Sequence, residues 1–384
     1  MKTVVIASFA KFPNKDSNAI HLVNIGTIFS NIGYKVSFVG FGDQNTTDEF
    51  GKYFTLNVCK KRNLFSKIIN HLNMDNKLLK FIKKQSPFPN ILLLSACLNK
   101  RFYNKIANFC AKHHPETQLL LSITEQYTKD EFDKFSFFVK RGYKRNRYLN
   151  GEFNDYRYKM LCISHYLHQR FNKKGFNSMF LPFVFSNKYI GKIDSLNHDK
   201  INFIYSGSPH NKDQLAKMLL AFSELPDEYK KPIHLNLIGI DKKWIKEKVP
   251  SVLDKISAFS SFYGRQDYDF VREIYAISDF SILLRDNNKI FVKAGCPTKI
   301  IESLFYKVVP ITNLTGDLGD YLINKKNSFI VDDCSVRSFK NALISAIDNK
   351  NKITEMKEYC HETSQKYLES SNFNKALEDF LQIK

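Results

Sequence analysis

The chain lacks the cysteine spacing of a zinc site, and it lacks any apolar run long enough to cross a bilayer. Its seven cysteines are scattered and no two form a CxxC pair, which argues against a structural zinc and favours a reducing compartment. No segment approaches the roughly 20 apolar residues that a membrane-spanning helix needs. The apolar run in the opening MKTVVIASFAKF is too short for a signal peptide. We therefore expect a cytoplasmic protein.

Several chemical signatures are also missing. The sequence has no HExxH pattern, no repeat of solenoid length and no low-complexity tract. Asp267 and Asp269 have DxD spacing, but they stand where a helix is expected to begin, and capping that helix is the simpler role. No other pair of carboxylates is convincingly placed for Mg²⁺. The sequence therefore predicts neither a metal nor a resident cofactor.

Positive charge is abundant. The chain has 58 lysines and arginines against 38 acidic residues, a formal net charge of +20, which attracts anionic partners. The segment Lys134–Arg147, KFSFFVKRGYKRNR, holds six cations, no acid and interleaved aromatics. It could dock on anionic lipid or on a phosphorylated lipid-linked acceptor. Nucleic acid and an ordinary solvated face are the alternatives.

Apolar runs alternate with amphipathic helical stretches along both halves, which is typical of α/β domains. At 384 residues the chain suits two such domains of about 150–200 residues each. We expect an N-terminal domain over 1–185, a C-terminal domain over 186–360, and a terminal helix over 361–384 that packs back on the first domain. The predicted fold is two doubly wound, Rossmann-like domains facing a central cleft, with ligands beyond the carboxyl ends of the strands.

The stretch Gly295–Pro310, GCPTKIIESLFYKVVP, has the features of a site that binds phosphate and ribose. Pro297 suits the first position of a helix, and Gly295 lets backbone approach a ligand at its entrance. The amides and dipole at that entrance favour an anion. Thr298 and Glu302 are four residues apart, so we expect them, with Lys299, on the exposed side. An ordinary surface helix is the alternative.

These residues resemble glycosyltransferase family 4, which has the GT-B fold. YSGS…K, ending at Lys212, stands where the family has a glycine turn and cations that hold the diphosphate. LIG, ending at Gly239, and FYG, ending at Gly264, match its next strand ends. SDFSILLRDNN followed by GCPTKIIESLFYKVVPIT is similar to the donor-binding signature. CISHYLHQRF, from Cys162, matches the first domain more loosely.

The resemblance implies a hexosyltransferase that takes a nucleotide-diphosphate sugar, with a UDP-sugar favoured, and retains anomeric configuration. It implies that the N-terminal domain binds the acceptor and that the C-terminal domain binds the nucleotide sugar. It implies a saccharide or lipid-linked acceptor in capsule or lipopolysaccharide synthesis, with the protein peripheral at the inner membrane face. Nucleic acid is not an expected partner. A catalytically inactive glycosyltransferase-like scaffold and a basic nucleic-acid-binding protein are the alternatives.

Two positions depart from the family pattern. Ala294 replaces the first of two glutamates, and Ser208 replaces the usual arginine after the glycine turn. We expect Arg285 to supply the missing cation. The residues expected to bind the donor are Gly207, Ser208, Gly239, Gly295, Thr298, Lys299 and Glu302. Arg285 and Lys212 are expected to stabilise the leaving phosphate. In the first domain, Glu125 follows a predicted strand and is the candidate base for the acceptor hydroxyl.

Overall fold

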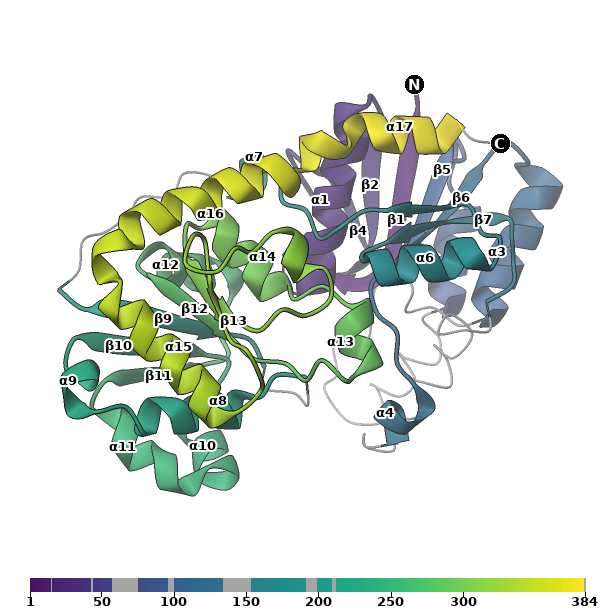
Figure 1. The fold of residues 1–384 in the computed structure, drawn as a ribbon. Coiled ribbons are helices and arrows are strands. Elements are labelled where there is room, and N and C mark those ends of the chain that lie inside the picture. Colours follow the sequence, from purple (N-terminus) through teal and green to yellow (C-terminus); the bar gives the residue numbers. More distant parts are fainter. Residues whose placement is uncertain are drawn as a thin grey trace. The chain divides into compact units, whose positions relative to one another are not determined.

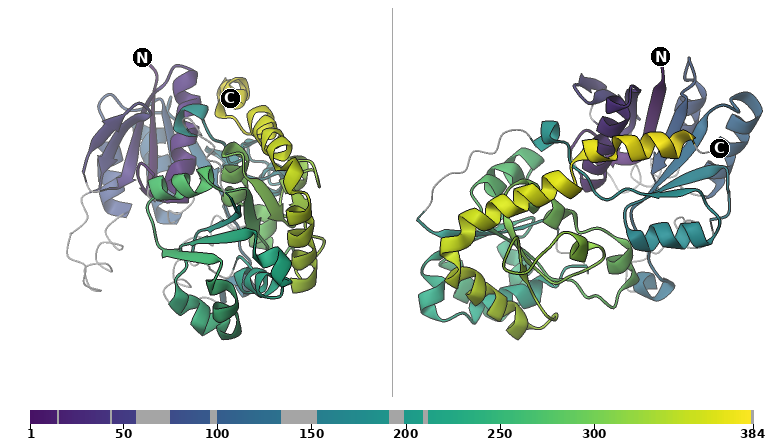
Figure 2. Two further views of the ribbon diagram at one scale, coloured as in Figure 1. Left: turned by 90° about the vertical axis from the view of Figure 1, so that its left-hand side faces the viewer. Right: turned by 45° about the horizontal axis from the view of Figure 1, so that its top comes forward.

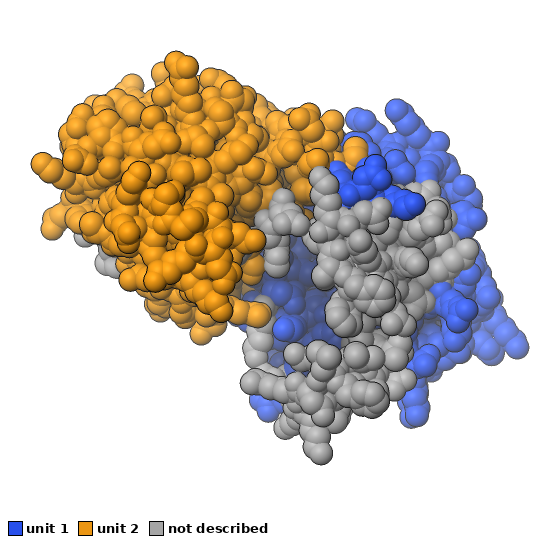
Figure 3. Space-filling view, turned by 90° about the horizontal axis from the view of Figure 1, so that it is seen from below, with its two compact units in different colours: residues 1–186, 370–384 blue, residues 187–369 orange. Residues whose placement is uncertain are grey.

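The computed structural model describes residues 1–14, 16–42, 44–56, 75–95, 100–133, 153–190, 199–208 and 212–382. The chain divides into two compact units (Figure 3): unit 1 comprises Met1–Ser186 and Ser370–Lys384, and unit 2 comprises Asn187–Glu369. The basic segment Lys134–Arg147 lies outside the described residues. Within the described ranges, no helix is both long and apolar enough to cross a membrane.

Unit 1 is built on a sheet with strand order β3-β4-β2-β1-β5-β6-β7-β8 (Figure 1). Every pairing is parallel except that between β3 and β4. Its strands are β1 (Thr3–Lys11), β2 (Lys35–Phe41), β3 (Thr46–Asp48), β4 (Gly51–Thr55), β5 (Ile91–Ser95), β6 (Gln118–Ile123), β7 (Tyr158–Cys162) and β8 (Ser178–Phe180). The central strand β5, ILLLS, is buried throughout, because a parallel strand is covered on both faces.

The helices of unit 1 include one from the far end of the chain. Among the described residues they are α1 (Ser17–Asn31), α3 (Lys100–His113), α4 (Lys129–Asp133), α6 (His165–Lys173) and α17 (Asn374–Gln382). Asp16 caps α1, since its carboxylate accepts from the amide of Ala19 at 2.8 Å. Ser17 is the first residue of this helix. Asn18 donates to the Ser8 hydroxyl at 3.0 Å.

Unit 2 is a parallel sheet with strand order β11-β10-β9-β12-β13-β14. Its strands are β9 (Ile201–Ser206), β10 (Ile233–Ile238), β11 (Ser260–Gly264), β12 (Phe280–Leu283), β13 (Val309–Thr312) and β14 (Phe329–Ile330). Its helices are α7 (Asn187–Ile190), α8 (Leu215–Ser223), α9 (Asp227–Lys230), α10 (Lys242–Lys248), α11 (Leu253–Ser257), α12 (Tyr268–Ala276), α13 (Ile290–Ala294), α14 (Thr298–Phe305), α15 (Val336–Asp348) and α16 (Ile353–Tyr367). Two doubly wound α/β units are thus present, as the alternation of elements predicts.

Helix α8 starts later than its sequence pattern predicts. The pattern suggests a helix from Lys212, but α8 begins at Leu215. The preceding residues are held in a loop, because Asp213 forms an antiparallel bridge with Arg285. The amide of Gln214 also donates to the carbonyl of Leu284 at 2.8 Å. Tertiary hydrogen bonds have therefore replaced the first helical turn.

The return of the chain to unit 1 starts at Ser370, whereas a return from 361 was expected. Helix α16 stays in unit 2 because it packs on α14 and β13 and buries Met356 and Cys360. Helix α17 then lies beside α1 (Figure 2). The ammonium of Lys159 donates to the carbonyls of Phe380 and Leu381, both at 3.2 Å, so a cation sits at the negative end of α17.

Replacing Lys159 with methionine tests this attachment. We expect the free energy of unfolding to fall by about 1–2 kcal/mol, because two terminal carbonyls lose a charge-assisted partner. Urea titration monitored by circular dichroism measures the change. The matched control is Lys112→Met, an exposed lysine in the last turn of α3, which should change stability by no more than about 0.5 kcal/mol. Equal effects of the two substitutions would contradict this role of Lys159.

Candidate functional site

The candidate site lies in unit 2, at the carboxyl ends of parallel strands. Strand β9 ends at Ser206, β12 at Leu283 and β13 at Thr312, and these strands are neighbours in the sheet. Loops after the three strands carry Gly207, Arg285 and Asn313. Helix α14 begins beside them with Thr298 and Lys299. Ligands of doubly wound sheets bind at this edge.

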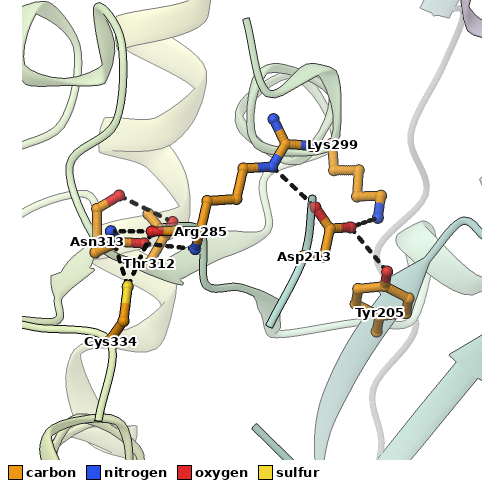
Figure 4. Close-up of polar contacts among 7 residues, drawn as sticks. All are labelled: Tyr205, Asp213, Arg285, Lys299, Thr312, Asn313 and Cys334. Atoms are coloured by element: carbon orange, nitrogen blue, oxygen red, sulfur yellow. Dashed lines mark hydrogen bonds and ion pairs between the residues drawn. The ribbon is translucent and has the colours of Figure 1, made fainter. Parts of the chain in front are cut away.

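A carboxylate that sequence reasoning missed is at the centre of the site (Figure 4). Asp213 is buried, with only 4% of its side chain exposed. One oxygen accepts from Nε of Arg285 at 2.8 Å, and the other accepts from Nζ of Lys299 at 2.5 Å. The Tyr205 hydroxyl donates to the second oxygen at 2.8 Å. Three donors thus converge on one acid.

These charges shift the protonation of the acid and the amine. Burial alone would raise the pKa of Asp213, but the nearby Lys299 and Arg285 outweigh it and hold the pKa well below its usual range. Burial is also the largest influence on Lys299 and lowers its pKa, while the Asp213 carboxylate opposes that effect. The Lys299 ammonium additionally lies 4.1 Å from the ring centroid of Tyr205.

The predicted cation Arg285 is present in the site, but it is partly neutralised. Its side chain is 13% exposed and pairs with Asp213. Its backbone is clamped by Asn313, whose side-chain oxygen accepts from the Arg285 amide at 3.0 Å. The same side chain donates to the Arg285 carbonyl at 2.8 Å, and the Cys334 thiol donates to that carbonyl at 2.9 Å. Arg285 is therefore held at its backbone by Asn313 and Cys334 and at its guanidinium by Asp213.

Gly207 makes the close approach of Lys299 possible. Its φ is +129°, a region that favours glycine. A Cβ on this residue would lie 2.7 Å from Cε of Lys299. Gly239 has a φ of +83°, and a Cβ there would lie 2.6 Å from the Gly207 carbonyl oxygen. Both strand-end glycines expected from the sequence therefore have steric reasons to be glycine.

Helix α14 differs from expectation in its start and its exposure. Pro297 precedes the helix at the cap position, and its carbonyl accepts from the amide of Ile300 at 2.9 Å. Glu302 was expected on an exposed side but is only 9% exposed. Sequence reasoning failed here because α16 packs on α14 and tyrosines surround the carboxyl group. Ile300 and Leu304 of the same helix are fully buried in the core.

Glu302 lies in an environment of tyrosines. The Tyr268 hydroxyl bonds to it, and burial, the largest influence, raises the pKa of Glu302 to about 7. The hydroxyls of Tyr268 and Tyr306 lie 3.5 Å apart, and the rings of Tyr306 and Tyr275 stack with centroids 5.1 Å apart. This carboxyl group therefore changes charge near neutral pH.

The other residues expected to bind the donor lie in loops and at helix ends of unit 2. Thr298 is the first residue of α14, and Gly295 ends α13. Ser208 is exposed just after Gly207. Lys212 precedes Asp213, and its ammonium lies 5.9 Å from the ring centroid of Phe291. Whether these residues contact a donor stays a prediction.

Glu125 belongs to unit 1. It is exposed after β6 and accepts from the Tyr127 hydroxyl at 2.8 Å. At the same sheet edge, His21 is buried and its Nε2 lies 3.2 Å from the Ser122 hydroxyl. Burial lowers the pKa of His21 to about 4, so this imidazole is neutral. The role of Glu125 as a base stays a prediction.

Asp267 has the capping role expected of it. Its side chain accepts from the amide of Phe270 at 3.0 Å at the start of α12. Within the described residues, no group of three or more histidine, cysteine or acidic side chains gathers in a way that could hold a metal ion.

Asp213 had one usable signal in the sequence. It is an acid directly after Lys212, in a loop at a strand end where only cations were expected. Its partners are 72 and 86 positions away, at Arg285 and Lys299. Only the fold shows that Arg285 and Lys299 share the Asp213 carboxylate.

Comparisons with known proteins agree with this architecture. Residues 190–366, which make up most of unit 2, match the model of the family described as Glycosyl transferases group 1. No curated protein sequence matches the chain. Similarity to solved structures extends over both units.

Three of these structures illustrate the likeness. A sucrose-phosphate synthase from Thermosynechococcus elongatus has a TM-score of 0.73 at 10% identity, covering 100% of this chain and 98% of that one. WaaG, a glycosyltransferase involved in lipopolysaccharide biosynthesis, has a TM-score of 0.69 at 10% identity, covering 99% and 100%. HepE from Anabaena, solved with UDP and glucose, has a TM-score of 0.64 at 9% identity, covering 99% of both chains. The fold is therefore GT-B, as the sequence resemblance implies.

The environment of Glu302 predicts a pH dependence of stability. Because the pKa of Glu302 is about 7 in the folded chain against the usual 4.5 of a glutamate, the folded state holds the proton more tightly. The contribution of Glu302 to the free energy of unfolding should therefore be fully present below about pH 4.5. It should be lost as the pH rises through about 7. At 1.36 kcal/mol per pKa unit, the loss is on the order of 3 kcal/mol at most.

Glu302→Gln should remove this contribution. We expect the stability difference between the variant and the natural chain to grow between pH 5 and pH 8, measured by urea unfolding at each pH. Glu358→Gln, which alters an exposed glutamate paired with Lys307, is the control and should leave the profile unchanged. A Glu302→Gln profile parallel to that of the natural chain would contradict the assignment.

Proposed function

We propose that the chain is a glycosyltransferase that moves a sugar from a nucleotide-diphosphate donor, favouring a UDP-sugar, to a saccharide or lipid-linked acceptor. The observation that carries this proposal is the pair of buried cations, Arg285 and Lys299, at the carboxyl edge of a group 1 glycosyltransferase domain. HepE, a structural neighbour, was solved with UDP and glucose, which supports the choice of base. WaaG, involved in lipopolysaccharide biosynthesis, supports a role in surface polysaccharide.

The diphosphate of the donor would meet the cations. In glycosyl transfer the bond between the anomeric carbon and the phosphate oxygen breaks, and negative charge grows on the leaving diphosphate. Fixed cations stabilise that charge without having to reorganise. Lys299 carries three N–H donors, and Asp213 takes one of them. The ribose would lie near Glu302, one helical turn from Thr298.

The reaction proposed here uses no metal and retains anomeric configuration. Arg285 and Lys299 supply the charge that a divalent cation supplies in other transferases. The acceptor hydroxyl would form the new bond to the anomeric carbon and lose its proton. Glu125 in unit 1 is the proposed group that orients this hydroxyl or accepts the proton.

Nucleotide affinity tests the donor site. We expect UDP to bind more tightly than GDP, dTDP or CMP in isothermal titration calorimetry, with no change on adding EDTA. Lys299→Met should weaken UDP binding at least about tenfold, equivalent to about 1.4 kcal/mol, because a buried cation is lost. The control is Lys357→Met, whose ammonium pairs with Asp279 at 2.7 Å elsewhere in unit 2.

Three results would each count against the proposal. If no nucleotide binds, the inactive scaffold becomes the better account. If Lys299→Met binds UDP as the Lys357→Met control does, the cation pair is not the donor site. If UDP binds only with a divalent cation, the metal-free mechanism is wrong. Release of UDP from UDP-glucose on adding a saccharide acceptor would extend the result from binding to transfer.

We also propose that the basic segment Lys134–Arg147 docks the chain on the inner face of an anionic membrane. Clustered lysines and arginines near a surface contribute about 1 kcal/mol each to binding anionic lipid. In a vesicle sedimentation assay, we expect the protein to pellet with anionic vesicles and not with neutral ones, and salt should weaken the binding. Replacing Lys140, Arg141, Lys144 and Arg145 with glutamine should abolish the preference. Equal pelleting with both vesicle types would contradict this role.

A further inference from the structure

Asp213 contacts both cations of the proposed donor site, yet a carboxylate would not itself bind the diphosphate of the donor. We propose that Asp213 is a positioning residue that locks Arg285 and Lys299 into one anion-binding pair. This inference rests on the proposed donor function of the same site. Its geometric support is the set of contacts in Figure 4, where the carboxylate lies between the two cations.

Two buried cations need a counter-anion to stay together. The side chains of Arg285 and Lys299 are 13% and 16% exposed, so water screens their mutual repulsion poorly. Removing one partner from a buried charge cluster leaves the others uncompensated. Asp213 supplies one negative charge to two positive ones, so the trio keeps a net charge of +1. That surplus leaves the pair able to attract a phosphate.

The contacts of Asp213 also leave donors available. It uses Nε of Arg285, and among the described residues no hydrogen bond or ion pair involves the two terminal nitrogens of that guanidinium. Those terminal nitrogens present the fork that suits phosphate oxygens. Held by Nε and by its clamped backbone, the guanidinium is fixed in orientation before a ligand arrives, which lowers the entropic cost of binding.

Asp213 is itself fixed by the fold. Its backbone pairs with that of Arg285, and the following residue, Gln214, donates to the Leu284 carbonyl at 2.8 Å. Tyr205 of β9 adds a hydrogen bond of 2.8 Å from its hydroxyl. A carboxylate anchored by main chain and side chain from separate elements has the rigidity that positioning requires.

The charged groups around Lys299 give a measurable consequence. Burial lowers the pKa of Lys299, Arg285 lowers it further, and Asp213 raises it, as does Glu302 on the same helix. The ring of Tyr205 lies under the ammonium. Replacing Asp213 with asparagine keeps the shape but removes the closest negative charge. Lys299 should then lose its proton at a lower pH.

The experiment compares Asp213→Asn with a matched control, Asp279→Asn. Asp279 is another carboxylate of unit 2 with little exposure, 14% of its side chain, and it accepts hydrogen bonds from the Lys357 ammonium and the Asn202 backbone amide. The first readout needs no nucleotide: the rate at which acetic anhydride acylates Lys299 at pH 6 to 10, followed by mass spectrometry. The second readout is the affinity for UDP over the same pH range, by calorimetry. Circular dichroism checks that each variant is folded.

In Asp213→Asn, we expect the Lys299 acylation profile to move to lower pH. If the profile moves by one pH unit, about tenfold more of the amine is neutral at a given pH below the pKa, and acylation there is about tenfold faster. The pH above which UDP affinity is lost should also be lower in Asp213→Asn than in the natural chain. Asp279→Asn should match the natural chain in both readouts. In a Lys299→Arg background the titrating amine is absent, so Asp213→Asn should no longer move the high-pH limit of UDP binding.

Two outcomes would overturn the positioning role. One is an acylation profile of Asp213→Asn that superimposes on that of the natural chain. The other is tighter UDP binding by Asp213→Asn at every pH with an unmoved high-pH limit, which would identify Asp213 as a competitor of the diphosphate. A chain that binds no nucleotide but still shows the displaced acylation profile would refute the donor function while leaving the link between Asp213 and Lys299 intact.

Discussion

The interaction on which the site depends is a single carboxylate, Asp213, shared by two buried cations and a tyrosine hydroxyl. Burying one positive charge in unit 2 is costly, and burying two side by side is more so. Asp213 offsets that cost and ties together the ends of β9 and β12 and the start of α14. Gly207 supports this arrangement, because its φ of +129° favours glycine and a Cβ there would push the end of the Lys299 side chain out of its position.

The parallel sheet of unit 2 explains why the charged residues of the site lie together. A parallel sheet gathers the loops after β9, β12 and β13 at one edge, so residues far apart in the chain meet there. Backbone clamps, such as that of Asn313 on Arg285, fix the loops that carry the charges. A charged group held in advance stabilises developing negative charge better than a mobile one. These clamps therefore give loop residues the fixed geometry that the proposed chemistry needs.

Much of this could be predicted from the sequence, for reasons tied to particular elements. Buried parallel strands have a near-continuous apolar run, so the run ILLLS predicts β5 with its observed bounds. The strand-end glycines Gly207 and Gly239 and the helix residue Lys299 match the order of the donor-binding pattern in the family that the sequence resembles, so the sequence identifies them as candidates. The burial of Glu302 was not predictable, because a helix pattern does not reveal that tyrosines from α7 and α12 cover the polar side. The role of Asp213 was not predictable either, because its partners Arg285 and Lys299 are distant in the sequence and only the fold brings them to its carboxylate.

A crystal structure of the protein with UDP tests the central claim most directly. The account predicts the diphosphate within hydrogen-bond distance of Lys299 Nζ and of the terminal nitrogens of Arg285. It also predicts that Asp213 still accepts from Nε of Arg285. UDP bound away from the carboxyl edge of the unit 2 sheet would contradict the donor site. Diphosphate oxygens in the place of the Asp213 carboxylate, with that side chain turned away, would contradict the positioning role.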